Sequence, residues 1–427
     1  MTKKFSSETN LPWWKKGVIY QIYPRSFYDT SGNGIGDLKG ISKKISYLSS
    51  LGVDAIWLSP VFTSPMKDMG YDVSNYTDID PLFGDIYDFE KLIEKAKQNK
   101  IKVIIDQVLS HSSDTHPFFK LSKSNKNNSK SDWYVWADPK PDGSPPNNWL
   151  SVFGGSAWEW DTSREQYYLH NFLKSQPDFN FHNIDVQKWL LSTVKFWLEK
   201  GVDGFRLDTA NYYFHDKKLR NNPAIKSRAS GKNPYYFQNL KYSINQKDNF
   251  AFLKKLRKLT DEYKEKTMIG EISNVELQAK YTANNDKLHM AYSFDLLRDE
   301  FSPKHIRNTV SKFFKETKDG WPTWSFSNHD VVRHLSRWNK TKKDRQKFAK
   351  LTCALLMSLK GTPCIYQGEE LGQTQTKIEF DEIKDPPGKK FWPMDFGRDG
   401  CRTPMIWDES KKFCLLYTSP SPRDEKV

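Results

Sequence analysis

The sequence predicts an α/β protein built as a (β/α)₈ TIM barrel. Three observations support this fold: short apolar runs alternate with amphipathic helical stretches, eight such runs occur along the chain, and polar residues gather where the runs end. Alternating strands and helices favour a parallel sheet with crossover helices. A doubly wound sheet is the alternative. No glycine-rich phosphate loop follows the first run, which counts against a nucleotide-binding version of that fold.

The predicted strands are the apolar runs at residues 18–23, 55–58, 102–106, 204–208, 268–272, 291–294, 323–327 and 364–367. Between them, apolar residues keep a helical period over residues 38–48 and again over residues 186–198. These two stretches stop at Gly52 and Gly201, as helices commonly do. In a barrel of this kind the active site lies at the carboxyl ends of the strands.

One connection is too long for a simple loop between a strand and a helix. Residues 112–183 are rich in Pro, Asn, Asp and Trp, and a loop of this length usually has a function or a fold of its own. We therefore expect an inserted subdomain after the third strand, with the barrel at residues 1–111 and 184–408. Residues 409–427 carry no further β/α pattern, and we expect a non-family tail or a truncation scar there.

Composition excludes several classes of protein. With 37% hydrophobic and 15% aromatic residues, the chain can bury enough apolar surface to fold. No window approaches the roughly 18 apolar residues of a membrane span, and the first residues lack the apolar core of a signal peptide. The 4 Cys form no C-x-x-C pair, which argues against a disulfide scaffold or a thiolate zinc site. We predict a soluble, cytoplasmic protein, either a monomer or a weak homo-oligomer.

The net charge of +14 raises the alternative of nucleic-acid binding. Lysines are however spread along the chain in pairs such as Lys254-Lys255 rather than gathered in one arm. No zinc finger, RNA-recognition signature or basic zipper is present. The prediction is a lysine-rich surface with no nucleic-acid partner and no membrane partner.

Charged residues at the strand ends are the candidates for chemistry. Several carboxylates at one rim, beside two His and an Arg, are costly to desolvate unless they are paired or used. The alternative is an ion-pair network that caps the barrel. The residues concerned are Asp106, His111, Arg206, Asp208, Glu271, His329 and Asp330.

Six motifs together carry a resemblance to a known family. They are Gly70-Tyr-Asp72, Asp106-Gln-Val-Leu-Ser-His111, Gly204-Phe-Arg-Leu-Asp208, Gly270-Glu271, Phe326-Ser-Asn-His-Asp330 and Tyr366-Gln-Gly-Glu-Glu370. The chain resembles the α-amylase family of glycoside hydrolases (family 13), and within it the bacterial α-glucosidases, over nearly its whole length. Ser110 is a departure, because many relatives have Asn there. Relatives continue into a last barrel helix and a C-terminal β domain, so we expect that domain to be missing; an inactive truncated fragment is one alternative.

The resemblance implies a retaining glycosidase in which Asp208 is the nucleophile, Glu271 the acid/base and Asp330 the third acidic residue. Arg206, two residues before Asp208, points to the same side of its strand and can keep Asp208 ionised. The pKa of Glu271 must then be higher than that of Asp208. The resemblance also implies a set of substrate-binding residues: Asp72, His111, Phe153, Phe172, Arg206, Thr209, His329 and Arg398.

The substrate expectation rests on the insertion and on one residue. A pocket enclosed by a subdomain favours exo-action on short oligosaccharides. In relatives, Val after the nucleophile accompanies α-1,6 preference, and smaller or polar residues accompany α-1,4 preference; here that residue is Thr209. We predict an α-1,4-type α-glucosidase acting on maltose-like or sucrose-like sugars. An oligo-1,6-glucosidase is the alternative.

A metal site is also predicted, for structure rather than for catalysis. Asp29, Ser31, Asn33, the Ile35 carbonyl and Asp37 alternate like the first positions of an EF-hand loop. Relatives with a similar pattern bind Ca²⁺ or Mg²⁺ here. Because Ser31 and Asn33 lower the ligand charge, we expect weaker affinity. The alternative is a glycine-rich turn without an ion.

Overall fold

The structure is a computed structural model that describes residues 11–225, 233–341 and 343–407. The predicted tail at residues 409–427 therefore lies outside the described residues, as do the first ten residues of the predicted barrel segment.

Eight parallel strands form one sheet, which confirms the predicted barrel. The sheet order is β11-β10-β9-β5-β2-β1-β13-β12, and a parallel bridge between Ala291 and Pro322 joins the two ends of the sheet. The strand expected at 323–327 is shorter than predicted, because only Thr323–Trp324 pair with a neighbour. The strands are β1 Ile19–Ile22, β2 Ala55–Leu58, β5 Lys102–Gln107, β9 Gly204–Leu207, β10 Thr267–Ile272, β11 Met290–Ser293, β12 Thr323–Trp324 and β13 Thr362–Tyr366.

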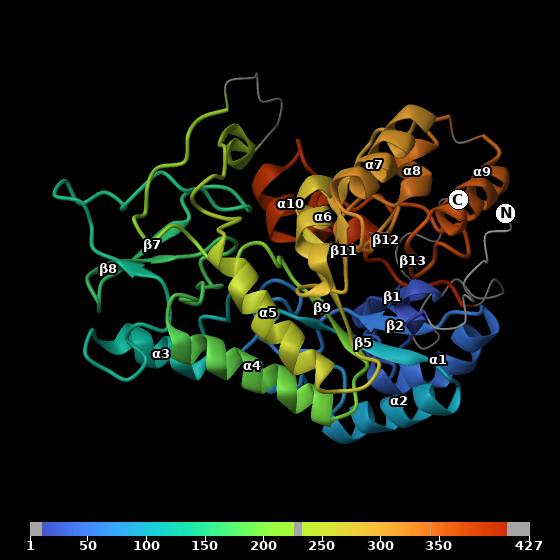
Figure 1. Ribbon diagram of the computed structural model, residues 1–427, viewed down its shortest axis with the longest axis horizontal. Helices are drawn as coiled ribbons and strands as arrows, with labels where there is room; N and C mark the ends of the chain where they lie inside the picture. The colour runs from blue at the N-terminus through green and yellow to red at the C-terminus, as the bar shows by residue number, and fades with distance from the viewer. Residues whose placement is uncertain (1–10, 226–232, 342, 408–427) are drawn as a thin grey trace, which may run out of the picture.

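Helices surround this sheet (Figure 1). The side chain of Asp37 accepts a hydrogen bond from the Gly40 N–H and so caps the start of the first helix, which ends just before Gly52 at a φ of 79°. The helices that follow the strands are α1 Leu38–Ser50, α2 Ile86–Gln98, α4 Ile184–Glu199, α5 Asp248–Asp261, α6 Val275–Thr282, α7 Pro303–Glu316, α8 His334–Trp338, α9 Arg345–Ser358 and α10 Pro386–Phe391. Short 3₁₀ turns include η4 Pro234–Phe237 and η6 Phe294–Leu297.

The connection between β5 and α4 carries structure of its own and extends to one side of the barrel (Figure 1). It contains α3 Pro117–Ser124 and a three-stranded antiparallel sheet of β6 Trp136–Ala137, β8 Gln166–Leu169 and β7 Trp158–Asp161. Trp149 and Trp158 are buried in a small core there. The inserted subdomain after the third barrel strand is thus confirmed, and its boundaries stay a prediction. A two-stranded hairpin, β3 Phe62–Thr63 and β4 Asn75–Ile79, follows β2.

The barrel has two apolar cores, one between the strands and the helices and one inside the barrel. Strand residues facing outward pack against the helices in one large apolar cluster. Residues facing inward form a second cluster, in which Ile19, Ala55, Ile104 and Ile269 fill the barrel. Alternate residues of a strand point to opposite faces, so polar side chains at the carboxyl ends of these strands stand directly above this filled interior.

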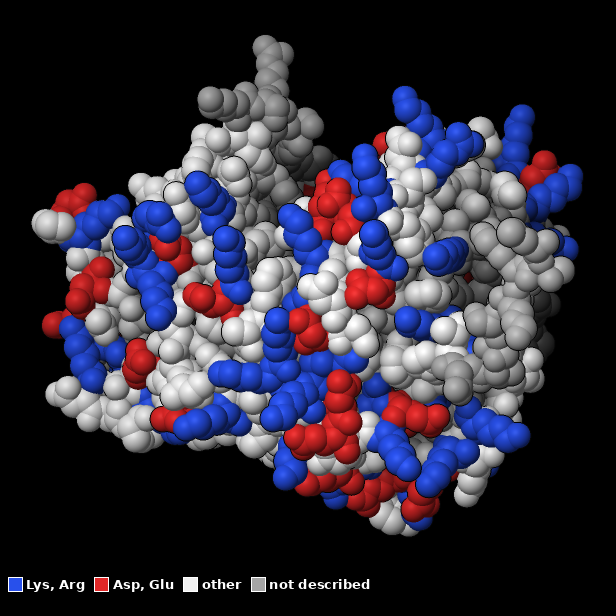
Figure 2. All heavy atoms as spheres, viewed as in Figure 1, with Lys and Arg blue, Asp and Glu red and all other residues white. Residues whose placement is uncertain are grey.

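The surface mixes both signs of charge. Lys and Arg side chains are spread across the visible face with Asp and Glu among them (Figure 2). Among the described helices, none is long and apolar enough to cross a membrane.

Candidate active site

A single buried arginine joins the carboxylates at the strand ends. Arg206 is fully buried at the end of β9, and two-residue periodicity places Asp208 on the same side. The Nη1 atom of Arg206 donates to Asp106 Oδ1 at 2.8 Å and to Asp208 Oδ1 at 2.8 Å. Its Nη2 atom donates to Glu271 Oε2 and to the Tyr292 hydroxyl, each at 2.7 Å. One guanidinium therefore holds the predicted nucleophile and the predicted acid/base together.

Residues from neighbouring segments hold the acid/base candidate, Glu271, in place. A Cβ atom at Gly270 would lie 2.3 Å from Cδ1 of Leu288, so a larger residue just before Glu271 would require the Leu288 side chain to shift. The backbone N–H of Thr209 donates to Glu271 Oε2 at 3.0 Å. Thr209 adopts a φ of 40°, which costs a β-branched residue about 1–3 kcal/mol. Strain of this kind beside a nucleophile is typical of a functional site.

Burial raises the pKa of both carboxyls. Burial raises the pKa of Glu271 to about 8; Arg206 lowers it, and Asp208 and Asp330 raise it further. Burial also raises the pKa of Asp208, to about 7, while Arg206 works in the opposite direction and a hydrogen bond with Glu271 lowers it as well. Burial therefore raises the pKa of both carboxyls, and the Arg206 guanidinium opposes this rise at each of them.

The third acidic residue stands among cations. Asp330 Oδ1 accepts hydrogen bonds from Arg398 Nη1 at 3.1 Å and from Arg402 Nη2 at 2.9 Å. Burial alone would raise the pKa of Asp330, but His329 and the two arginines outweigh it and lower that pKa. Asp330 is therefore ionised at neutral pH and can accept hydrogen bonds from sugar hydroxyls.

Arg398 is held by two further acids that the sequence analysis did not single out. Asp385 is fully buried; its Oδ1 accepts from Arg398 Nε at 2.8 Å, and its Oδ2 accepts from the Arg398 backbone N–H at 2.9 Å. Asp68 Oδ1 accepts from Arg398 Nη2 at 2.8 Å. Nothing in the local sequence marks Asp385, because it lies thirteen residues before its partner in an irregular segment.

Within the part of the chain that the structure describes, the carboxylate of Asp72 makes no hydrogen bond or ion pair with the other predicted site residues. Its carboxylate accepts hydrogen bonds from a hydroxyl and from two backbone N–H groups of its own loop. Asp68, four residues earlier, faces the site instead: it contacts Arg398 and accepts from Gln176 Nε2 at 3.0 Å. A loop has no fixed period, so the sequence could not show which of these two acids points inward.

Aromatic residues complete the floor. The Tyr71 hydroxyl donates to Asp106 Oδ2 at 3.0 Å and lies against His329 Nε2, and the two rings stack with centroids 5.4 Å apart. The Trp57 indole N–H donates to Asp106 Oδ2 at 3.3 Å. Asp106 and Tyr71 belong to motifs quoted above, but only their contacts show that they support Arg206 and His329.

The inserted subdomain supplies one wall. The ring of Phe172 lies 5.2 Å from that of His111 and 5.5 Å from that of Phe153, and the Arg398 guanidinium lies 5.1 Å over the Phe153 ring. His111 Nε2 donates to the Tyr71 carbonyl at 3.0 Å, and burial lowers the pKa of His111 to about 4, so its ring is neutral at pH 7. These three predicted residues thus lie beside the charged cluster.

Comparison with known proteins decides the family. The family model for the “Alpha amylase, catalytic domain” matches residues 21–418. The chain belongs to the α-amylase family. It is 53% identical over 412 residues to “Probable alpha-glucosidase” of Rhizobium meliloti (strain 1021), covering 94% of this chain and 75% of that protein. It is 40% identical to “Oligo-1,6-glucosidase” of Heyndrickxia coagulans, covering 96% of this chain and 79% of that protein.

A solved structure agrees. The crystal structure of the α-glucosyl transfer enzyme XgtA superposes with a TM-score of 0.91 at 53% identity, covering 93% of this chain and 76% of that one. The barrel with its inserted subdomain is therefore the α-amylase family catalytic fold.

The predicted metal ligands lie elsewhere in this α-amylase fold, in the loop between β1 and α1. Asp29 accepts hydrogen bonds from the backbone N–H groups of Ser31, Gly32 and Gly34. The Asp37 carboxylate accepts from the backbone and hydroxyl of Thr30 and caps α1. Within the described residues, no group of three or more His, Cys, Asp or Glu side chains could hold a metal ion. The oxygen ligands suit a hard cation, but the N–H groups of the loop compete for both carboxylates.

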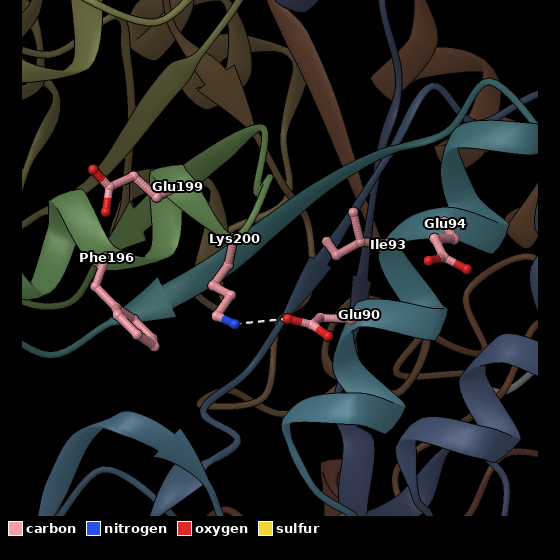
Figure 3. Close-up of a pocket in the computed structure, with 6 residues that line it drawn as sticks. All are labelled: Glu90, Ile93, Glu94, Phe196, Glu199 and Lys200. Atoms are coloured by element: carbon pink, nitrogen blue, oxygen red, sulfur yellow. Dashed lines mark hydrogen bonds and ion pairs between the residues drawn. The ribbon is translucent and has the colours of Figure 1, made fainter.

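A separate pocket of about 480 Å³ lies outside the barrel between α2 and α4. Figure 3 shows its lining residues, with Lys200 Nζ donating to Glu90 Oε1 at 2.6 Å. These side chains belong to the outer helical layer, away from the strand ends, and the acids among them pair with lysines of the same two helices or their ends. The predicted site residues therefore lie at the barrel rim and not in this pocket.

Proposed function

We propose that this protein is a retaining, exo-acting α-glucosidase that releases terminal α-linked glucose from maltose-like or sucrose-like sugars. The observation that carries the proposal is the pair of buried carboxyls, Asp208 and Glu271, that one Arg206 guanidinium holds together. Its class, a glycoside hydrolase with α-glucosidase activity, is supported by the relative at 53% identity.

The first step would break the glycosidic bond. Ionised Asp208 attacks the anomeric carbon, and Glu271 gives its proton to the departing glycosidic oxygen, which leaves as an alcohol or a sugar. The glucosyl unit is then an ester of Asp208. Arg206 holds both groups throughout, and as Glu271 becomes ionised the same guanidinium stabilises its new charge.

The second step would regenerate the enzyme. Glu271 takes a proton from water, the water oxygen attacks the anomeric carbon, and the bond to Asp208 breaks. Two inversions at the anomeric carbon give net retention. Every proton and bond in these steps is supplied by the two carboxyls, the sugar and water, so no cofactor is required.

The remaining residues would bind the glucose ring. Beside the catalytic pair, the carboxylates of Asp330 and Asp68 are hydrogen-bond acceptors, and Arg398 contacts both of them. His329 adds an imidazole ring that burial keeps neutral by lowering its pKa. Charged groups that are already held in place lose little freedom when sugar hydroxyls bind. We propose Asp68, rather than Asp72, as the acid that contacts the sugar.

Linkage choice and acceptor choice are finer proposals. Thr209 places a hydroxyl 3.3 Å from Asp208 Oδ2, which supports α-1,4 preference over the 1,6 preference named for the Heyndrickxia coagulans relative. Transfer is a second candidate function, supported by the likeness to the α-glucosyl transfer enzyme. It would use the same glucosyl ester, with an acceptor hydroxyl in place of water.

We also propose a weak structural Ca²⁺ or Mg²⁺ site in the loop of residues 29–37. Asp29 and Asp37 would supply the charge, and Ser31, Asn33 and the Ile35 carbonyl the neutral oxygens. The ion would hold the turn between β1 and α1, remote from the two catalytic steps.

Incubating the full chain with maltose, sucrose and isomaltose tests the proposal. We expect glucose from all three, with the highest kcat/KM on maltose or sucrose. Asp208→Asn should abolish release, because the amide cannot attack the anomeric carbon. Asp142→Asn, at an exposed loop position, is the matched control and should retain full activity. No release by the parent chain from any of the three sugars would contradict the proposed activity.

A further inference from the structure

A row of hydrogen-bonding side chains connects His111 with the predicted nucleophile. Ser110 and Thr209 follow the neighbouring strands β5 and β9, and the Asp208 N–H ties the ends of these strands together by donating to the Gln107 carbonyl at 3.1 Å. Ser110 Oγ lies 2.8 Å from His111 Nδ1 and 3.1 Å from Thr209 Oγ1. Thr209 Oγ1 lies 3.3 Å from Asp208 Oδ2. The row therefore runs from His111 through Ser110 and Thr209 to Asp208.

The direction of each hydrogen bond in this row follows from the state of its first member, His111. The Nε2 atom of His111 lies 3.0 Å from the Tyr71 carbonyl, which can only accept, so Nε2 carries the proton of the neutral ring. The Nδ1 atom then has no hydrogen, and the Ser110 hydroxyl must donate to it. Because a hydroxyl has only one hydrogen, Ser110 Oγ can only accept from Thr209.

The Thr209 hydroxyl thus has one hydrogen and two possible acceptors, Ser110 Oγ and Asp208 Oδ2. While Asp208 is ionised, its carboxylate is the stronger acceptor, because a hydrogen bond to a charged group is about twice as strong as a neutral one. Ser110 is 1% exposed, so water does not compete with Thr209 for its Oγ atom. The protein therefore keeps a second acceptor ready for the Thr209 hydroxyl.

The first step of the proposed reaction reverses this preference. Arg206 holds Asp208 Oδ1 at 2.8 Å, which leaves Oδ2 to attack the anomeric carbon. As the bond from Oδ2 to carbon forms, the bond to the leaving oxygen breaks, that oxygen takes the proton of Glu271, and Oδ2 loses its negative charge. The Thr209 hydroxyl then turns about its Cβ–Oγ1 bond and donates to Ser110. No proton is transferred in this turn.

We propose that Ser110 is a positioning residue that accepts the Thr209 hydroxyl while Asp208 Oδ2 bonds to the sugar, and that it thereby favours formation of the glucosyl ester. The inference rests on the proposed α-glucosidase function and adds a residue to its first step. Without the Ser110 hydroxyl, the Thr209 donor would lose its acceptor at the point where Asp208 no longer serves, and an unpaired donor is costly away from water.

Two variants, measured singly and together, test the proposal. The substrate is α-glucosyl fluoride, because its leaving group is a single atom and its kcat/KM reports formation of the glucosyl ester. We expect Ser110→Ala to lower this kcat/KM by about three- to tenfold, the effect of one net hydrogen bond. In the Thr209→Val background there is no hydroxyl to accept, so the loss should be smaller by about threefold or more. The lost contact with His111 is common to both backgrounds and cancels from this comparison.

The inhibition constant of glucose separates this role from a structural one. Glucose binds while Asp208 is still ionised, so Ser110→Ala should leave this constant within about twofold of the parent value. The matched control is Ser122→Ala, which removes a buried serine hydroxyl of α3 that accepts from Trp136 Nε1 at 3.0 Å. It should change kcat/KM by the same factor in both backgrounds.

Two results would overturn the role of Ser110. One is a loss from Ser110→Ala that agrees within about twofold between the two backgrounds, and the other is a glucose inhibition constant that rises as much as kcat/KM falls. If Ser110→Ala does not fold, Ser110→Cys replaces it under the same criteria, because a thiol is a weak acceptor. Failure of the parent chain to cleave α-glucosyl fluoride would instead contradict the α-glucosidase function itself, so the two failures are distinguishable.

Discussion

Arg206 is the residue on which the site depends. It is fully buried, and removing a buried cation that pairs with three carboxyls would leave those acids uncompensated. Its Nη1 atom contacts Asp208 and its Nη2 atom contacts Glu271. The positive charge of the guanidinium therefore offsets the repulsion between the two acids and keeps them close together. In the proposed mechanism, the same contact stabilises Asp208 as the ionised nucleophile while Glu271 carries the proton.

Glu271→Gln tests the acid/base role. We expect kcat on maltose to fall by about 10²–10⁴-fold, while KM changes little, because the amide cannot transfer a proton but keeps the shape of the side chain. In the parent chain kcat/KM should fall as pH rises through about 8, where Glu271 loses its proton. That alkaline decline should be absent in the variant.

The control for this experiment is Glu199→Gln, an exposed position at the end of α4. It should keep both the parent kcat and the alkaline decline. A Glu271→Gln chain with near-parent kcat would remove Glu271 from the mechanism.

Thr209→Val tests the linkage proposal at one residue. Val keeps the β-branched shape and therefore the same backbone strain at a φ of 40°, but it removes the hydroxyl that contacts Asp208 and Ser110. We expect the kcat/KM ratio of maltose to isomaltose to fall by about tenfold, the effect of one lost polar contact worth about 1–3 kcal/mol. A ratio that stays within twofold would show that Thr209 does not set linkage choice.

At the scale of elements, the inserted subdomain contains a buried carboxyl whose pKa is raised. Asp178 is 3% exposed and bridges the strand-end residue His111 through the backbone. Its Oδ2 accepts from the Asn171 backbone N–H at 2.6 Å, yet burial raises the pKa of Asp178 to about 8. Between about pH 4 and pH 8, this carboxyl is therefore protonated in the folded chain and ionised in the unfolded chain.

Asp178→Asn should gain stability relative to the parent chain as pH rises. With a folded pKa above the unfolded one, the stability contributed by the protonated carboxyl is complete below about pH 4 and is lost as pH rises through about 8. Asn never ionises, so the variant escapes this loss. Urea unfolding followed by circular dichroism should show a relative gain of about 1–4 kcal/mol between pH 5 and pH 8. Asp138→Asn, at an exposed position, should show none; a pH-independent difference for Asp178→Asn would contradict the assigned pKa.

The loop of residues 29–37 gives a second test at this scale. If it binds Ca²⁺ with a dissociation constant of about 10⁻⁴–10⁻³ M, then about 10 mM Ca²⁺ should stabilise the fold by about 1.4–2.7 kcal/mol. A rise in Tm on adding CaCl₂, reversed by EDTA and reduced in Asp29→Asn, is the expected result. An unchanged Tm in 10 mM CaCl₂ or MgCl₂ would favour a turn held only by its own hydrogen bonds.

Prediction from sequence succeeded where a periodic pattern exists. The eight strands and the helices ending at Gly52 and Gly201 follow from apolar spacing, and Arg206 and Asp208 share a face because strand side chains alternate. Irregular segments gave no such guide: the contact of Asp68 with Arg398 could not be predicted, because the loop conformation decides which side chain points toward Arg398, and the role of Asp72 stays a prediction. Asp385 was missed for the same reason.

At the scale of the whole molecule, the site exists only because distant segments meet. The barrel closes through the bridge between Ala291 and Pro322, and this closure brings the ends of β5, β9, β10 and β12 to one rim. The subdomain and the segment after β13 meet at that rim, where the Arg398 guanidinium lies over the Phe153 ring. The oligomeric state, the cytoplasmic location and the absence of a nucleic-acid partner stay predictions.

The most direct test of the account is the configuration of the first sugar released. Proton NMR of the anomeric region during the first minutes of maltose hydrolysis, before mutarotation, distinguishes the two outcomes. Because Asp208 and Glu271 are held by the same guanidinium and contact each other, as a retaining pair does and an inverting pair does not, the account predicts α-glucose as the first product. β-Glucose as the first product would contradict a covalent intermediate on Asp208 and the retaining mechanism with it.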